Sequence, residues 1–291
     1  MKLASYEISG TASYGIVSDG MVVDTGAIWR ATATDLRDAL EKGLFETPFE
    51  VDKSAPRYPL DTVRLLPVIP NPRKILCIGV NYKTHLRETG REQPAYPMVF
   101  VRFAESQVGD RQAMIRPPES EKFDFEGELA VVIGKAGRRI SRRDALAHVA
   151  GYSCYNDGSI RDWQRHTTQF TAGKNFPSTG AFGPWLVTGD EIPDPAELTL
   201  VTRLNGKEVQ RAEVSDLVFD VPALIEYCSS FTTLRPGDVL VTGTTSGVGA
   251  FRDPPLWLKP GDLVEVEISK IGILTNPVQD EGTDETIRLR G

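Results

Sequence analysis

The sequence is poor in cysteine, and the cysteines it has form no recognisable pair. Cys77, Cys154 and Cys228 are odd in number, lie far apart and show no CxxC spacing. A disulfide framework, a zinc ribbon and a dithiol redox centre are therefore not expected. We interpret all three as small hydrophobic residues of a core.

Long hydrophobic runs are also missing. The longest, such as Ile75 to Val80 and Leu129 to Ile133, are far shorter than the roughly 20 residues that span a bilayer. The residues after Met1 alternate between polar and apolar types and lack the apolar stretch of a secretory signal. We expect no transmembrane helix, no membrane partner and a cytoplasmic protein.

Positive charge is in short supply as well. The chain has 33 Lys and Arg against 40 Asp and Glu, which leaves a net charge of -7. Nucleic acids and anionic membranes favour basic surfaces, so neither is an expected partner. An anionic substrate would have to be attracted by a local group of cations.

The remaining composition suits a globular protein, with 40% hydrophobic and 25% charged residues in a chain of 291. Strand-like alternation occurs at Ala4 to Ile8 and Gly15 to Val23. A helical stretch follows from Thr34 to Leu44, with a threonine as its expected cap. These patterns predict a small N-terminal α+β domain.

Prolines mark the end of that domain. Five of them lie between Pro56 and Pro72, where no long helix is indicated, and this density of fixed backbone angles suits a connection between domains. We expect a small domain over residues 1–70 and a main domain over residues 71–291.

The main domain is expected to be mainly β, a mixed α+β sandwich or roll with peripheral helices. Helical patterns at Ser141 to His148 and Val221 to Phe231 are too few to cover a parallel sheet on both faces. Short β-rich runs separated by Gly and Pro recur instead; they are Lys74 to Val80, Met98 to Arg102, Glu126 to Ile133, Trp185 to Thr188, Leu198 to Leu204, Val239 to Thr242 and Leu263 to Ile268.

Alternating acids open one of these strands. Asp124, Glu126 and Glu128 share one face if the strand includes them, and like charges side by side are unfavourable unless a cation or water relieves them. Oxygen-only ligands suit Mg²⁺ or Mn²⁺. Gly127 leaves the opposite face open to a close neighbour. An acidic, solvated strand start is the open alternative.

Asp157 offers a third carboxylate. Arg161 and Gln164 follow it at helical steps of four and three, which return to one face. The alternative is an Asn-Asp-Gly turn that caps an ordinary helix. The local sequence leaves both readings open.

His85 and Glu88 lie at i and i+3 in a short helix that Gly90 is expected to end. Glu88 is then placed to orient the imidazole as a general base. A surface histidine beside a glutamate is the common alternative. Lys174 lies in a loop of small residues, where it could meet a substrate carboxylate or point to water.

The glycine-rich segment Thr242 to Gly249 follows a strand but lacks the GK[ST] ending of a phosphate loop. We expect it to form a tight loop that offers hydroxyl and amide N–H groups to an anion.

Taken in order, these segments resemble the fumarylacetoacetate hydrolase family from about Lys74 to Asn276. The pattern G-x-N-Y-x-x-H-x-x-E is met by Gly79 to Glu88, D-F-E-G-E-L-A-V-V-I by Asp124 to Ile133, and G-Y-x-x-x-N-D by Gly151 to Asp157. Elements R-D-x-Q, G-K-x-F, G-P-W, P-G-D and T-G-T-x-x-G-V-G follow in the family's succession. So many independent motifs in one order make coincidence implausible.

The resemblance implies a metal centre with a catalytic dyad. Glu126, Glu128 and Asp157 would be the ligands of Mg²⁺ or Mn²⁺. His85 and Glu88 would be the water-activating dyad on a mobile lid.

The resemblance also implies substrate contacts and an assembly. Lys174 would contact the substrate and the transition state, and Arg161, Gln164 and Thr244 match positions that line the pocket. Val80, often Arg in the family, is a departure that bears on substrate preference, as is Thr245, often Pro. A homodimer is suggested as well.

The function implied is that of the acylpyruvate hydrolase branch, which acts on fumarylpyruvate or maleylpyruvate in aromatic-ring catabolism. A metal-dependent hydrolase of this kind cleaves a C–C bond in a 2,4-dioxo acid and releases pyruvate and a carboxylic acid. Water activated by His85 would attack the distal carbonyl, and the metal and Lys174 would stabilise the pyruvate enolate.

Two alternatives to hydrolysis stay open. One is decarboxylation of oxaloacetate or a related 2-oxo diacid through the same enolate. The other is a non-catalytic binding protein with a structural ion. In both enzymatic readings the substrate is a small anionic 2-oxo acid.

Overall fold

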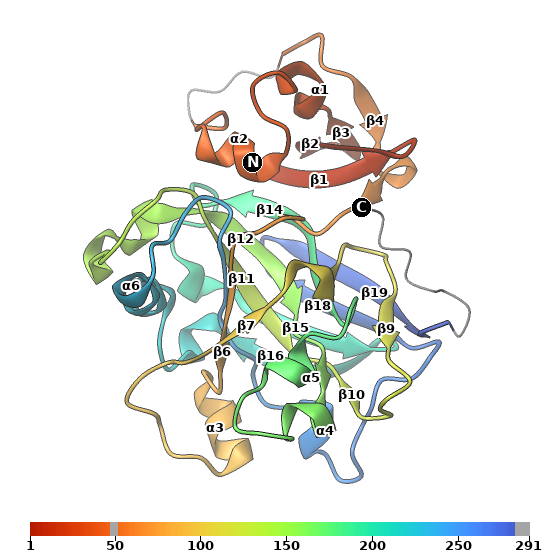
Figure 1. Cartoon of the computed structure of the whole chain (residues 1–291), viewed down its shortest axis with the longest axis vertical. Coiled ribbons are helices and arrows are strands. Elements are labelled where there is room, and N and C mark those ends of the chain that lie inside the picture. Colours follow the sequence, from red (N-terminus) through yellow and green to blue (C-terminus); the bar gives the residue numbers. More distant parts are fainter. Residues whose placement is uncertain (47–51, 283–291) are drawn as a thin grey trace.

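The computed structural model describes residues 1–46 and 52–282 (Figure 1). Most strands lie in a 12-stranded sheet in the order β4-β3-β2-β1-β14-β12-β11-β17-β6-β7, with β5 and β8 attached to β1 and β14. Their bounds are β1 Lys2–Ile8, β2 Thr11–Ser18, β3 Met21–Val23, β4 Arg57–Pro59, β5 Arg64–Leu65, β6 Ile75–Gly79, β7 Met98–Arg102, β8 Gln107–Val108, β11 Gly127–Ile133, β12 Val149–Asn156, β14 Gly180–Thr188 and β17 Val239–Val241.

A second sheet has five strands in the order β16-β15-β18-β19-β9, and β10 and β13 form a separate pair. The five are β9 Met114–Arg116, β15 Thr199–Leu204, β16 Lys207–Glu213, β18 Leu263–Ile268 and β19 Gly272–Asp280; the pair is β10 Phe123–Asp124 and β13 Ser159–Ile160. The α-helices are α1 Thr25–Trp29, α2 Leu36–Glu41, α3 Lys83–Thr89, α4 Arg161–Gln164, α5 Thr171–Lys174 and α6 Val221–Phe231. Short 3-10 segments are η1 Leu60–Thr62, η2 Ala104–Ser106, η3 Arg142–His148, η4 Pro195–Glu197, η5 Val214–Asp216 and η6 Gly249–Phe251.

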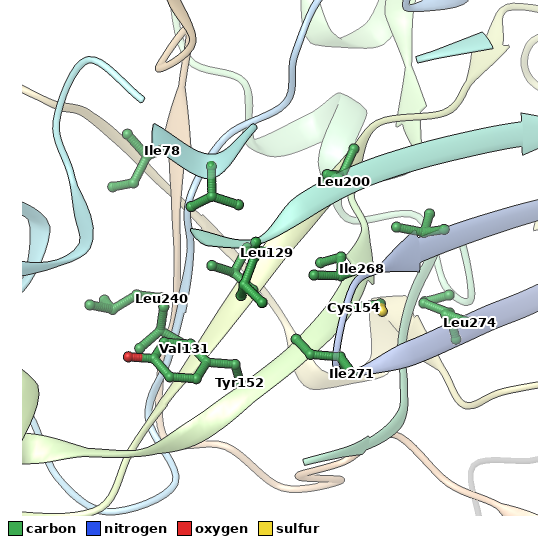
Figure 2. Packing of buried hydrophobic residues seen from close by; sticks show 14 of the residues in the cluster. Ile78, Leu129, Val131, Tyr152, Cys154, Leu200, Leu240, Ile268, Ile271 and Leu274 are labelled. Carbon is green, nitrogen blue, oxygen red and sulfur yellow. The ribbon is translucent and has the colours of Figure 1, made fainter. Parts of the chain in front are cut away.

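The two sheets share one core. Leu129 and Val131 of β11 face Leu200, Ile268 and Leu274 of the smaller sheet (Figure 2). The alternate residues of β11 pack into a second cluster on the other face of the large sheet. Burial on both faces explains why β11 is apolar without interruption from Leu129 to Ile133, and each such Leu or Val contributes roughly 1.5–3 kcal/mol.

The expected mainly β, mixed α+β fold with peripheral helices is confirmed. All three cysteines are buried, as expected. Among the described residues, no helix has both the length and the apolar character needed to cross a bilayer.

The N-terminal strands extend the large sheet. Lys2 and Leu3 of β1 pair with Val187 and Leu186 of β14, so the sheet continues across residue 70. The division into 1–70 and 71–291 stays a prediction. Figure 1 shows β1 to β4 at one end of the molecule and α3, α4 and α5 at the other.

Some local predictions were wrong. The helix expected from Thr34 is α2, and its cap is Asp35, whose side chain accepts the N–H of Asp38. Strands β12, β16 and β19 were missed; β16 is a polar edge strand, and β12 includes Gly151 and Ser153, which hide its pattern. The helix expected from Ser141 is the 3-10 segment η3.

Candidate active site

Three buried carboxylates meet where β11 begins and β12 ends. Glu128 lies in β11, Glu126 just before it, and Asp157 just after β12. Because these strands are antiparallel neighbours, Gly127 pairs with Asn156, and the Asp157 N–H donates to the Glu126 carbonyl at 2.9 Å. One oxygen from each carboxylate lies within 4.8 Å of the others, which is close enough to hold one metal ion. The solvated and helix-capping readings are thus wrong.

Close packing behind the carboxylates requires glycine. A Cβ at Gly127 would overlap the Thr202 hydroxyl of the second sheet. The close neighbour that we expected beside Gly127 is therefore present. A Cβ at Gly173 would overlap the backbone of Gln164, so only glycine lets α5 lie against α4. That contact brings Lys174 to the carboxylates.

Lys174 is the last residue of α5 and is 1% exposed, so neither a loop nor a water-facing side chain is found. Its Nζ lies 2.7 Å from Glu126 Oε2 and 2.6 Å from Asp157 Oδ2. The ammonium therefore bridges two of the three carboxylates.

Arg161 links the carboxylates to a fourth acid. Its Nη2 lies 2.6 Å from Glu126 Oε1, its Nε donates to Asp124 Oδ2 at 2.7 Å, and its Nη1 donates to Gln164 Oε1 at 3.0 Å. The expectation that Asp124 projects together with Glu126 and Glu128 is wrong. Strand β10 ends at Asp124 and β11 starts only at Gly127, so the alternation is interrupted.

Arg102, at the end of β7, was missed. Its buried Nη1 donates to Asp157 Oδ1 at 2.5 Å and to the Gly158 carbonyl at 2.8 Å, while its Nη2 donates to Thr179 Oγ1 at 2.9 Å. The one sequence signal was a charged residue closing an otherwise apolar strand. Because Arg102 binds Oδ1 of Asp157, the other oxygen, Oδ2, faces Lys174 in the site.

The pKa values of two glutamates in this cluster are shifted in opposite directions. Although burial opposes it, the charges of Arg161 and Lys174 lower the pKa of Glu126 to about 2. Burial, and then the charges of Asp157 and Glu126, raise the pKa of Glu128 well above its usual range. Glu128 has the Gly243 N–H as its partner, at 2.6 Å.

The unbalanced charge fits a metal ion. Within this cluster, four buried acids face three buried cations, and among the described residues no lysine or arginine forms an ion pair with Glu128. A buried carboxylate without a counter-charge costs several kcal/mol. A hard divalent cation between three carboxylates would offset that cost, and an all-oxygen donor set suits such a cation. The acids are Asp124, Glu126, Glu128 and Asp157, and the cations are Arg102, Arg161 and Lys174.

The His85–Glu88 pair forms as expected. The Nδ1 of His85 lies 2.7 Å from Glu88 Oε2 in α3, and Gly90 ends the helix with a φ of 64°. His85 is buried, so the surface alternative is wrong. Its ring meets Phe251 edge-on, with centroids 5.9 Å apart. The proposed mobility of this segment stays a prediction.

The glycine-rich loop donates to the protein's own carboxylates. The N–H groups of Gly243, Gly247 and Gly249 bind Glu128, Glu88 and Asp124 respectively, at 2.6, 2.8 and 2.7 Å. Gly243 and Gly247 have φ values of 102° and 97°, which favour glycine. The loop thus holds anions, but anions of the site itself.

A cavity of about 90 Å³ joins these groups. Seven of the nine expected site residues border it: His85, Glu126, Glu128, Arg161, Gln164, Lys174 and Thr244. Thr244 Oγ1 donates to the Gly127 carbonyl at 2.9 Å and accepts from Gln210 at 2.9 Å. The other two do not border the cavity but bind residues that do: Glu88 contacts His85, and Asp157 contacts Lys174.

We name two groups of residues at this cavity. The floor consists of the buried charges that border its inner end or bind directly to those that do, namely Arg102, Glu126, Glu128, Asp157, Arg161 and Lys174. The mouth consists of the solvent-exposed wall residues Arg91, Arg165 and Phe251.

Sequence comparison identifies the family. The model described as fumarylacetoacetate (FAA) hydrolase C-terminal matches residues 74–279. This chain belongs to the fumarylacetoacetate hydrolase family. The solved fumarylacetoacetate hydrolase of Exiguobacterium antarcticum has a TM-score of 0.85 and 35% identity, with 97% of this chain and 100% of that chain covered. The family fold is therefore shown.

Curated relatives bear on the reaction. Oxaloacetate tautomerase FAHD2A, mitochondrial, of Bos taurus is 41% identical over 89% of this chain and 84% of the relative. The corresponding Xenopus laevis protein is 41% identical over 96% and 90%. The maleylpyruvate hydrolase of Sphingobium sp. SYK-6, solved with manganese (II) and pyruvate, is more distant, at 28% identity and a TM-score of 0.81 over 97% of this chain and 100% of that chain.

These findings correct two expectations. The prediction of a C–C hydrolase of the acylpyruvate branch is wrong, because the relatives at about 41% identity are named oxaloacetate tautomerases. An enzyme is supported, and so is the oxaloacetate-type alternative. A cytoplasmic location is likewise contradicted, since the same relatives are named mitochondrial.

Proposed function

We propose that this protein interconverts the keto and enol tautomers of oxaloacetate or a closely related 2-oxo diacid. The observation that carries the proposal is the floor, in which three carboxylates lie together beside Lys174 and across one small cavity from His85. The names of the curated relatives support the substrate class.

Glu126, Glu128 and Asp157 would hold Mg²⁺ or Mn²⁺. When bound, the ion would supply a Lewis acid that withdraws charge from the 2-oxo oxygen and orients the adjacent carboxylate. The manganese in a solved family member supports this choice, as does the all-oxygen donor set.

His85 is placed to move the proton at C3. Its Nδ1 is bound to Glu88, which leaves Nε2 as the nitrogen available to the cavity. In the keto-to-enol direction, the C3–H bond breaks, its electron pair forms the C2–C3 double bond, and Nε2 takes the proton. The Glu88 carboxylate stabilises the resulting imidazolium.

Lys174 acts on the oxygen atom bonded to C2. Although burial opposes it, the charges of Asp157 and Glu126 raise the pKa of Lys174, so its ammonium stays protonated. It donates a hydrogen bond to the 2-oxygen, where negative charge develops as the C2–O π electrons move to oxygen. The enolate oxygen takes its proton from solvent, and His85 returns to its starting state by giving its proton to solvent.

The size of the cavity supports a short substrate. At about 90 Å³, the cavity is well below the roughly 300–1,000 Å³ of ordinary ligand pockets. A four-carbon diacid is therefore favoured over a long acylpyruvate. The homodimer expected from the resemblance stays a prediction.

A direct assay tests the reaction. Metal-loaded protein is mixed with the enol form of oxaloacetate, and conversion to the keto form is followed spectroscopically against buffer containing the same metal. Pyruvate release and acylpyruvate cleavage are measured in parallel. The proposal expects faster tautomerisation with no pyruvate burst. Pyruvate at the same rate would indicate decarboxylation instead, and no turnover with metal bound would leave a binding role.

A further inference from the structure

Two arginines stand at the mouth of the cavity. Arg91 follows the cap of α3, and Arg165 is the residue that ends α4. Both border the cavity that Glu126 and Glu128 line from within, and both are exposed. Within the described ranges 1–46 and 52–282, neither guanidinium forms an ion pair or a side-chain hydrogen bond.

Their freedom contrasts with the other arginines of the site. Arg102 and Arg161 are buried and each binds an acid of the floor at 2.5 to 2.7 Å. In a chain with a net charge of -7, two unpaired cations at one opening supply the local attraction that a small anion needs.

Arg165 also has a defined position. Its guanidinium carbon lies 5.8 Å from the centre of the Phe251 ring, a cation–π arrangement. Phe251 belongs to η6, where the Gly249 and Ala250 N–H groups donate to Asp124 at 2.7 and 2.9 Å. The same ring contacts His85. Phe251 thus links Arg165 to His85 of the dyad and, through the η6 amides, to Asp124, the partner of Arg161 in the floor.

The wall between the dyad and the mouth adds no charge. Val80 lines the cavity with an apolar side chain and has a φ of 54°. A cation for the far end of a substrate must therefore come from the mouth.

We propose that Arg91 and Arg165 bind the distal carboxylate of a dianionic 2-oxo acid and so select dicarboxylates over monocarboxylates. The identity of the substrate rests on the proposed function. In a cavity of about 90 Å³, a molecule whose 2-oxo acid end lies at the floor has its other end at the mouth. Guanidinium groups match the planar geometry of a carboxylate.

The test measures binding without turnover. The probes are 3,3-difluorooxaloacetate and trifluoropyruvate, which share a fluorinated 2-oxo acid end, lack any C3 hydrogen and differ in the distal carboxylate. Calorimetry on the full chain loaded with Mn²⁺ gives both dissociation constants for the wild type, Arg91→Gln, Arg165→Gln and the double variant. Arg87→Gln is the matched control, because Arg87 is exposed on α3, the helix that ends just before Arg91, and does not border the cavity.

The wild type is expected to prefer the dicarboxylate by on the order of 10-fold or more, the effect of one charge-assisted hydrogen bond. The double variant loses this preference, while its affinities for trifluoropyruvate and Mn²⁺ stay within about twofold of wild type. Arg87→Gln changes nothing. A double variant that keeps the preference, or that loses affinity for both probes equally, would overturn the assignment. Because neither probe can tautomerise, this result is independent of whether oxaloacetate is turned over.

Discussion

The floor and the mouth of one cavity are built in opposite ways. Every charged group of the floor is buried and has an assigned partner, most often a second buried charge. At the mouth, Arg91 and Arg165 are exposed, and Phe251 is 44% exposed. Buried charges fix one another, so the floor determines where a metal ion and the reacting atoms lie. The mouth can vary with little effect on folding, so it is suited to substrate selection.

The floor itself contains a second contrast. Glu126 has two cationic neighbours, whereas Glu128 has none among the described residues and accepts an amide N–H instead. The fold thus neutralises one glutamate internally and leaves the other to an external cation.

Replacing Glu128 is expected to have the largest effect. Glu128→Ala removes one of three anionic ligands, so tight Mn²⁺ binding is lost, and activity falls by about 10³-fold or more when several kcal/mol of Lewis-acid stabilisation disappear. Calorimetry and the tautomerase assay measure the two losses. Full activity with tight metal binding in this variant would refute the ligand assignment.

Breaking the buried Arg102–Asp157 pair should come next. Arg102→Gln leaves Asp157 without its 2.5 Å partner and is expected to lower the free energy of unfolding by about 3–5 kcal/mol. The exposed pair Arg116–Asp280 provides the control, since Arg116→Gln should cost about 1 kcal/mol or less. Urea unfolding of both variants measures the difference. Equal losses would mean that burial does not distinguish the floor from the surface.

His85 lies between floor and mouth, and its removal should separate catalysis from metal binding. His85→Ala is expected to reduce the rate by roughly 10²-fold or more, the usual contribution of general acid–base catalysis. Mn²⁺ affinity should stay near wild type, because His85 bonds to Glu88 and is outside the carboxylate group. Loss of bound metal in this variant would contradict the role.

The smallest effect concerns a buried acid that belongs to neither part. Burial raises the pKa of Asp110, although the Thr275 N–H, at 2.8 Å, opposes the shift. The folded state therefore binds the proton more tightly than the unfolded chain, and this contribution to stability, present below the usual pKa, is lost as pH rises through the raised pKa. Asp110→Asn should stabilise the protein at neutral pH by about 1 kcal/mol or less and change little at pH values below the usual pKa. A melting series over pH checks the slope, and an unchanged slope would contradict the shift.

The floor was partly accessible from the sequence. Glu126, Glu128 and Asp157 lie in two motif segments whose strand and turn character is local, and the resemblance joined them. Asp124 was misplaced because the break between β10 and β11 depends on its pairing with Arg161 and with the amides of the glycine-rich loop.

The partners of the floor were less accessible. Arg102 precedes Asp157 by 55 positions, and nothing local marks it as the group that orients this carboxylate. The burial of Lys174 depends on a contact between α4 and α5 that only the folded chain reveals. Long-range pairing of charges, rather than the presence of the carboxylates, was the part that sequence patterns could not supply.

One titration tests most directly whether the floor is a metal-dependent catalytic centre. Metal-stripped wild-type protein is titrated with Mn²⁺ while metal binding and oxaloacetate tautomerisation are measured on the same samples. The rate should rise in proportion to occupancy and reach its plateau at one ion per chain, and Glu128→Ala should show neither response. Full tautomerisation before any Mn²⁺ is added, or saturation of the wild-type site without a change in rate, would contradict the account.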